Sequence, residues 1–190
     1  MMANITWRPG IGDPTWIGWI TVAAYLISTI FCVQAGRHTR RHAREMQSES
    51  SQLWFSFAAG LFLLGINKQL DLQTAFIELG GQLALGQGWY QQRRLAQIIF
   101  VLLFGAIMIG ALFLMVFQRR HFFKNHGFVL LGSIFLAAFV FLRAVIFNHV
   151  DDDFGLSLGE GNWLHGVELT GIFCFIIAGF RAGKKNLPKK

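Results

Sequence analysis

Charged residues are scarce in this chain of 190 residues, since Asp, Glu, Lys and Arg together make up only 14% of it. A soluble domain has roughly 25% of these residues. By contrast, 54% of the residues are hydrophobic, including 20 Phe and 6 Trp. A chain of this size cannot bury so much apolar surface within itself, because small domains have a high ratio of surface to volume. A water-soluble monomer is therefore excluded, and we expect lipid to cover the remaining apolar surface.

Cysteine is also scarce. The two cysteines, Cys32 and Cys174, lie within apolar runs, which excludes a disulfide-stapled secreted domain and a metal or iron–sulfur site built from cysteines. The net charge is +7, an excess that could indicate a nucleic-acid partner. In a chain with long apolar runs, however, basic residues beside the runs orient the helices and contact anionic lipid headgroups. We therefore expect no nucleic acid to bind.

What the chain has in abundance is long apolar runs, most of which are long enough to cross about 30 Å of hydrocarbon. The second run is less regular, because Leu53 to Ile66 is apolar but mixed polar and apolar residues follow to Leu79 without a glycine or proline. This pattern predicts a helix whose second half is an amphipathic extension on the outer surface. The sequence thus predicts an all-α integral membrane protein that is a single transmembrane domain over residues 1–190. Its five spans, packed as a bundle, are expected at about 16–35, 53–72, 95–117, 127–147 and 163–180.

The Lys and Arg residues of the predicted loops orient these five spans. Twelve of them follow the first, third and fifth spans, whereas four lie on the opposite side. Because basic loops stay in the cytoplasm, we expect the N-terminus outside and the C-terminus in the cytoplasm. A cleaved signal peptide is the alternative account of the first run, but Arg8 is the only basic residue ahead of it. An uncleaved first span with this charge bias indicates a bacterial inner (plasma) membrane.

Ionisable residues inside the spans are the most informative feature, because burying them in hydrocarbon is costly. Asp71, Arg143 and Glu168 fall near the outer ends of the second, fourth and fifth spans, and Lys68 belongs to the same layer. The cations Lys68 and Arg143 can form ion pairs there with the anions Asp71 and Glu168, which costs less free energy than burying four isolated charges. Asn67 lies four residues before Asp71 and therefore shares its helical face.

Histidine and carboxylate residues continue this layer into the last outer loop. The patterns His149-x-Asp151 and His165-x-x-Glu168 supply four ligands from two segments joined by a short loop. Neutral imidazole together with carboxylate suits zinc, iron or manganese. One hypothesis is therefore a divalent metal held by His149, Asp151, His165 and Glu168. A haem is disfavoured, because His149 and His165 both lie at the outer end rather than facing each other within the hydrocarbon.

In a first functional hypothesis, this layer is the site of a hydrolase or transferase that acts on a lipid or small amphiphile. Asp71 or Glu168 is then the catalytic general base beside a metal-activated water. The residues expected to bind the substrate are Asn67, Lys68, Arg93, Arg94, Arg143 and Asn148. The arrangement resembles metal-dependent membrane hydrolases of the alkaline-ceramidase and adiponectin-receptor type. Those proteins have seven spans and a His-x-x-x-His pair in the last one, and neither is found in this chain, so the resemblance assigns no residue.

In a second hypothesis, the protein is a non-catalytic accessory or assembly subunit of a larger membrane protein complex. Glu168 then pairs with Arg143 or Lys68 and joins helices within the membrane. The first hypothesis predicts that the layer lines a water-accessible cavity, whereas the second allows its charges to be buried in ion pairs.

The cytoplasmic side has a different composition. Four histidines, His38, His42, His121 and His126, lie among seven basic residues of the first two cytoplasmic loops. A dense cationic field opposes the binding of a metal ion. We therefore expect a solvated collar on this side that contacts anionic lipid headgroups.

Overall fold

The computed structural model describes residues 15–41, 48–70, 93–147 and 163–185, and these residues are almost entirely helical. The described helices are α1 (Trp16–Arg41), α2 (Ser48–Leu70), α4 (Arg93–Gln118), α5 (Arg120–Asn125), α6 (Gly127–Phe147) and α8 (Trp163–Lys185). All of them except the short α5 are long and apolar enough to cross a membrane. The prediction of an all-helical membrane protein with five candidate spans is therefore confirmed, and lipid contacts the chain.

Several helices are longer than the apolar runs that predict them. Helix α1 continues past Ala35 to Arg41, and α8 continues past Phe180 to Lys185. Arg and Lys are good helix formers, so the helix does not end where the hydrophobic residues end. The amphipathic half predicted for the second helix follows Ile66, and only its first residues, to Leu70, are described.

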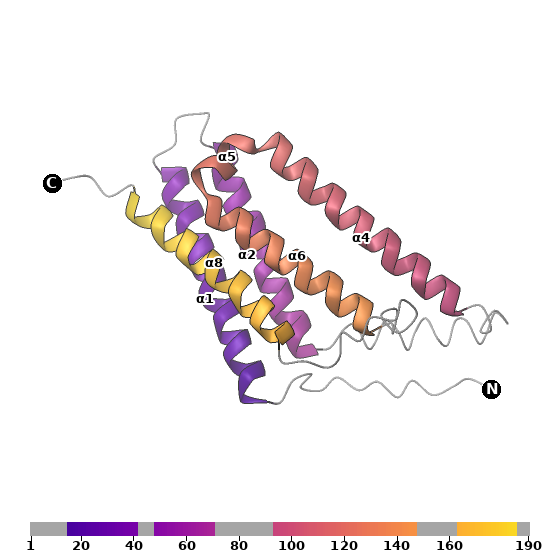
Figure 1. Cartoon of the computed structure of the whole chain (residues 1–190). Helices are drawn as coiled ribbons and strands as arrows, with labels where there is room; N and C mark the ends of the chain where they lie inside the picture. The colour runs from indigo at the N-terminus through magenta and orange to yellow at the C-terminus, as the bar shows by residue number, and fades with distance from the viewer. Residues whose placement is uncertain (1–14, 42–47, 71–92, 148–162, 186–190) are drawn as a thin grey trace, which may run out of the picture.

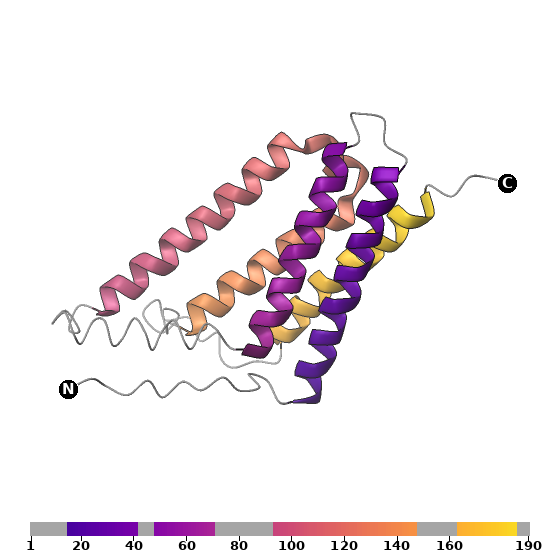
Figure 2. The ribbon, with the colours of Figure 1, turned by 180° about the vertical axis from the view of Figure 1, so that it is seen from behind.

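Four of the helices form a bundle, and the fifth lies at its edge. Helix α1 packs along α2 and α8, and α8 also packs along α6, whereas α4 lies on the side of the arrangement away from α1 and α8 (Figures 1 and 2). Helix α4 packs mainly on α6, where Val101 is buried with Val145. Most of the other side chains of α4 are exposed, among them Leu103, Ile107 and Phe113. In a membrane protein, such a surface contacts lipid or another apolar helix.

Helix α5 closes one end of the bundle. Two of its residues, Phe122 and Phe123, are buried. Phe122 packs edge-on against Trp54 of α2, with 5.7 Å between ring centroids, and Phe123 packs edge-on against Phe57 at 6.4 Å. Edge-to-face pairs of this kind contribute about 0.5–1.5 kcal/mol beyond the area that they bury. The turn between α4 and α6 is thereby attached to α2.

Glycines allow helices of the bundle to approach closely. A Cβ atom at Gly171 of α8 would lie 2.9 Å from Leu136 of α6, and one at Gly179 of α8 would lie 2.8 Å from Phe31 of α1. These distances are shorter than any normal carbon–carbon contact, so neither position has room for a larger residue. Close approach through small residues is a common mode of helix packing in membranes.

The two ends of the bundle differ in charge. At one end, which we call the basic end, lie the last turns of α1 and α8 together with α5 (Figure 1). The basic residues whose side chains are described there are Arg37, Arg40, Arg41, Arg119, Arg120, Lys124 and Arg181. Lys68, Arg143 and Glu168 lie toward the opposite end, which we call the polar end.

Candidate functional site

A charged cluster is buried toward the polar end, where α1, α2 and α8 meet. Glu168 lies in the second turn of α8 and Lys68 in the last turn of α2. The Lys68 Nζ donates a hydrogen bond to Glu168 Oε2 at 3.1 Å, and the two side chains are only 3% and 1% exposed. The Tyr25 hydroxyl of α1 donates to the other carboxylate oxygen, Oε1, also at 3.1 Å. Both oxygens of Glu168 therefore have partners, which come from two different helices.

His165 lies at the edge of this cluster. It is one helical turn before Glu168 on α8, and its Nδ1 lies 3.5 Å from Lys68 Nζ and 3.7 Å from Glu168 Oε2. The His165 side chain is 34% exposed, unlike its two neighbours. Among the described members of the cluster, it is therefore the one that is partly open to the surroundings.

Two further groups of α6 lie near the ion pair or near Tyr25. The Lys68 ammonium lies 5.9 Å from the centre of the Phe139 ring of α6, within the range of a cation–π contact. Arg143, also on α6, lies close enough to Tyr25 to interact with it electrostatically. All four bundle helices thus contribute to the polar layer, and hydrogen bonds join three of them, α1, α2 and α8.

The structure brings together only part of the predicted site. Lys68, His165 and Glu168 are in contact, and Arg143 is near them. Asn67 is half-buried beside Lys68 on α2, and Arg93 and Arg94 begin α4, where their side chains are not described. Asp71, Asn148, His149 and Asp151 lie outside the described residues, so the structure gives no geometry for the predicted base Asp71 or for two of the four predicted metal ligands.

Tyr25 is the member of the cluster that was not predicted. It lies within an uncharged run, where a tyrosine looks like ordinary apolar filling. The sequence of α1 does contain a pattern that could have identified Tyr25. Thr21, Tyr25, Ser28 and Cys32 recur at spacings of four, three and four residues, and all four are buried in the structure. This spacing defines one face of a helix, and a polar face in a membrane span indicates contact with other helices.

The cluster has limited capacity for a metal ion as it stands. The side chains described in residues 15–41, 48–70, 93–147 and 163–185 include no group of three or more His, Cys, Asp or Glu residues that could hold one. Both oxygens of Glu168 already accept hydrogen bonds, and Lys68 places a positive charge where a cation would bind. A metal at this position would therefore have to displace Lys68 from the carboxylate.

At the basic end, where a solvated collar is expected, His126 is half-buried. Its ring packs against Phe122 and Trp54, with centroids 4.7 Å and 5.3 Å away. His126 follows α5 directly, and the two buried phenylalanines of α5 draw the neighbouring imidazole into the same aromatic cluster. His42 lies outside the described residues.

Comparison of the chain with protein-family models, with characterised proteins and with solved structures gives no significant match.

Proposed function

We propose that this protein is an accessory or assembly subunit of a membrane protein complex, and that the charged cluster fixes the packing of its helices. The observation that supports this proposal is the state of Glu168. Its side chain is 1% exposed, and its two oxygens are occupied by Lys68 and Tyr25. A general base has to reach the proton of its substrate. A carboxylate enclosed in this way instead holds its neighbouring helices together through its hydrogen bonds.

The energetics of the ion pair agree with a packing role. Removing one partner of a buried pair leaves an uncompensated charge and typically costs about 3–5 kcal/mol, whereas replacing both partners by apolar residues is often neutral. Such a pair contributes little net stability but strongly disfavours any arrangement that separates its members. In this chain, the pair specifies which faces of α2 and α8 meet, and Tyr25 adds the face of α1.

A role as a subunit is further supported by α4. This helix packs mainly on α6 and presents apolar side chains on most of its surface. Most of the described residues lie in helices that can span a membrane, so contacts within the membrane are the main surface that the described part of the chain offers to other proteins. Helix α4 is the element with the most surface available for such contacts.

We further propose that the N-terminus lies outside and that the basic end faces the cytoplasm of a bacterial inner membrane. The seven basic residues described at that end support this orientation, because Lys and Arg are retained on the cytoplasmic side.

The substitution Glu168→Gln tests the subunit proposal. It removes the charge while keeping the shape, and it leaves Lys68 without its anion. We expect lower thermal stability in detergent and loss of membrane proteins that co-purify with the wild type. In the double variant Lys68→Met/Glu168→Leu, which replaces both charges, we expect most of the stability to return.

Thr170→Val is a matched control. Thr170 lies two residues from Glu168 on α8, and its hydroxyl bonds only to the carbonyl of Gly166 in its own helix. This variant should retain wild-type stability and partners. Unchanged stability and unchanged partners in Glu168→Gln would reject the subunit proposal.

A second candidate function is a site at the polar end that acts on a lipid or small amphiphile. In one version of this proposal, the site also binds a divalent metal. The position of His165 favours this candidate, because a partly exposed imidazole adjoins a buried ion pair. An intramembrane group of this kind is also typical of proton relays. Its signature would be stoichiometric zinc, iron or manganese in the purified protein that is lost in His165→Ala while the partners stay bound.

A further inference from the structure

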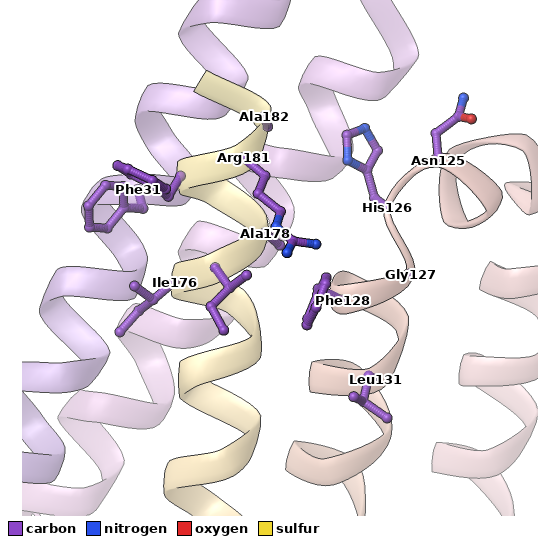
Figure 3. Close-up of a pocket in the computed structure, with 12 residues that line it drawn as sticks. Phe31, Asn125, His126, Gly127, Phe128, Leu131, Ile176, Ala178, Arg181 and Ala182 are labelled. Atoms are coloured by element: carbon purple, nitrogen blue, oxygen red, sulfur yellow. The ribbon is translucent and has the colours of Figure 1, made fainter. Parts of the chain in front are cut away.

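A groove lies at the basic end between the first turns of α6 and the last turns of α8 (Figure 3). Its volume is about 980 Å³, near the upper limit of the roughly 300–1,000 Å³ that small-molecule sites occupy. Most of its wall is apolar, with Phe31 from α1, Leu131 from α6, and Ile177 and Phe180 from α8. Helices from three parts of the sequence therefore enclose a space suited to a hydrocarbon chain.

The rim of the groove is polar and cationic. Asn125, His126 and Arg181 line it on the side of the basic end. The Arg181 guanidinium lies 4.5 Å from the centre of the Phe128 ring, a cation–π contact that holds the charge at the wall of the groove (Figure 3). The structure thus places a fixed positive charge directly beside an apolar surface.

The charge of Arg181 is not balanced by a described carboxylate. Glu168 is the only Asp or Glu whose side chain the structure describes, and it lies toward the polar end in contact with Lys68. The neighbouring side chains that are described at the basic end, such as Lys124 on α5, have the same sign as Arg181. The groove therefore favours a ligand that brings a negative charge of its own.

We infer that this groove binds an anionic phospholipid, with an acyl chain against Leu131 and Ile177 and the phosphate group at Arg181. The ligand must be apolar over most of its length and negative at one end, and a phospholipid of the same leaflet meets both conditions. A neutral amphiphile would fill the apolar part but bring no negative charge to the guanidinium, which has no counter-charge among the described side chains. An apolar helix of another protein would bury Arg181 against hydrocarbon, which is costly.

Photocrosslinking tests this inference directly on the full chain. The protein is reconstituted in phosphatidylcholine bilayers that contain a minor fraction of phosphatidylglycerol with a diazirine in one acyl chain. The crosslinked residues are then mapped by mass spectrometry. We expect the crosslinks to concentrate on Leu131, Ile177 and Phe180 and to be much weaker when the same diazirine chain is carried by phosphatidylcholine.

Substitution of Arg181 separates a specific site from general surface attraction. We expect Arg181→Gln to reduce the yield of groove crosslinks about fivefold, the factor that corresponds to about 1 kcal/mol per basic side chain near anionic lipid. Arg181→Lys, which keeps the charge, should retain most of the yield. The matched control is Arg40→Gln, because Arg40 is exposed at the same end on α1 but does not line the groove.

Three results would overturn the inference. The first is an equal loss of crosslinks in Arg40→Gln and Arg181→Gln, which would indicate unspecific attraction to the basic end. The second is an even distribution of crosslinks over the groove and over exposed residues of α4 such as Ile107. The third is removal of the groove crosslinks by excess inorganic phosphate, which would assign Arg181 to a soluble anion.

Discussion

At the scale of single residues, Glu168 shows how this chain accommodates a charge inside a membrane bundle. An ionised carboxylate in a medium of low polarity requires an opposite charge and hydrogen-bond donors. Lys68 supplies the charge on one oxygen, and Tyr25 supplies a neutral donor on the other. The two partners therefore contribute by different mechanisms, and their removal should have different consequences.

We expect Tyr25→Phe to lower the free energy of unfolding by about 1 kcal/mol, the usual net contribution of one hydrogen bond. Lys68→Met should cost several times more, because it leaves Glu168 buried without its counter-charge. Unfolding in mixed micelles, followed by circular dichroism, measures both. A loss for Tyr25→Phe as large as that for Lys68→Met would show that the tyrosine hydroxyl is essential to the cluster and would contradict this division of roles.

The sequence predicts the depth of such residues better than their contacts. Lys68, His165 and Glu168 were expected in one layer because each lies a known number of residues from the end of a span. Depth does not determine which faces of the helices meet, so the choice of Lys68 rather than Arg143 as the direct partner of Glu168 could not be predicted. That choice depends on the rotation of α2, α6 and α8 about their axes, which the packing of the whole bundle sets.

At the scale of helices, the most apolar span is also the least buried one. Among the five candidate spans, α4 has the highest mean hydropathy, 2.9, and is the least buried, whereas α8 has a mean hydropathy of 1.6 and is the most buried. Helix α2 departs from this trend, because it has the lowest mean hydropathy, 1.2, but is no more buried than α6. In a membrane, polar and small residues mediate helix contacts, and fully apolar surfaces are left to lipid. The peripheral position of α4 therefore agrees with its lack of polar residues. A high hydropathy by itself predicts only that the segment spans the membrane, not where it lies in the bundle.

Helix α8 offers an internal comparison for the role of close packing. A Cβ atom at Gly179 would lie within 3.0 Å of Phe31, including its backbone, whereas one at Gly183 would meet nothing within 4 Å. We expect Gly179→Ala to destabilise the bundle, because the backbone of α1 has to move. Gly183→Ala should be neutral or stabilising by up to about 1 kcal/mol, since alanine is the better helix former.

Thermal denaturation of both variants in the same detergent measures this difference. The two residues are one turn apart on one helix, so the contact of Gly179 with α1 is the main difference between them. Equal stability of the two variants would show that α1 and α8 are not held at the close distance described above.

At the scale of the whole molecule, the two ends have distinct compositions and distinct candidate roles. The basic end has the collar of Arg and Lys residues and the groove beside Arg181, whereas the polar end has the buried cluster with His165 at its edge. If the basic end faces the cytoplasm, the groove binds lipid of the inner leaflet and the cluster lies toward the outer leaflet. The orientation thus determines which leaflet each feature meets.

The two native cysteines make this orientation measurable. Cys32 and Cys174 are both buried, so the wild-type protein should give little reaction with a membrane-impermeant maleimide and can serve as the background. Trp163→Cys introduces a thiol at the polar end, where Trp163 is 42% exposed, and Lys124→Cys introduces one at an exposed position of the basic end. In intact spheroplasts we expect Trp163→Cys to be labelled and Lys124→Cys to be labelled only after the membrane is permeabilised. The reverse pattern would show that the protein has the opposite orientation in the membrane. The groove would then lie in the outer leaflet and the charged cluster in the inner one.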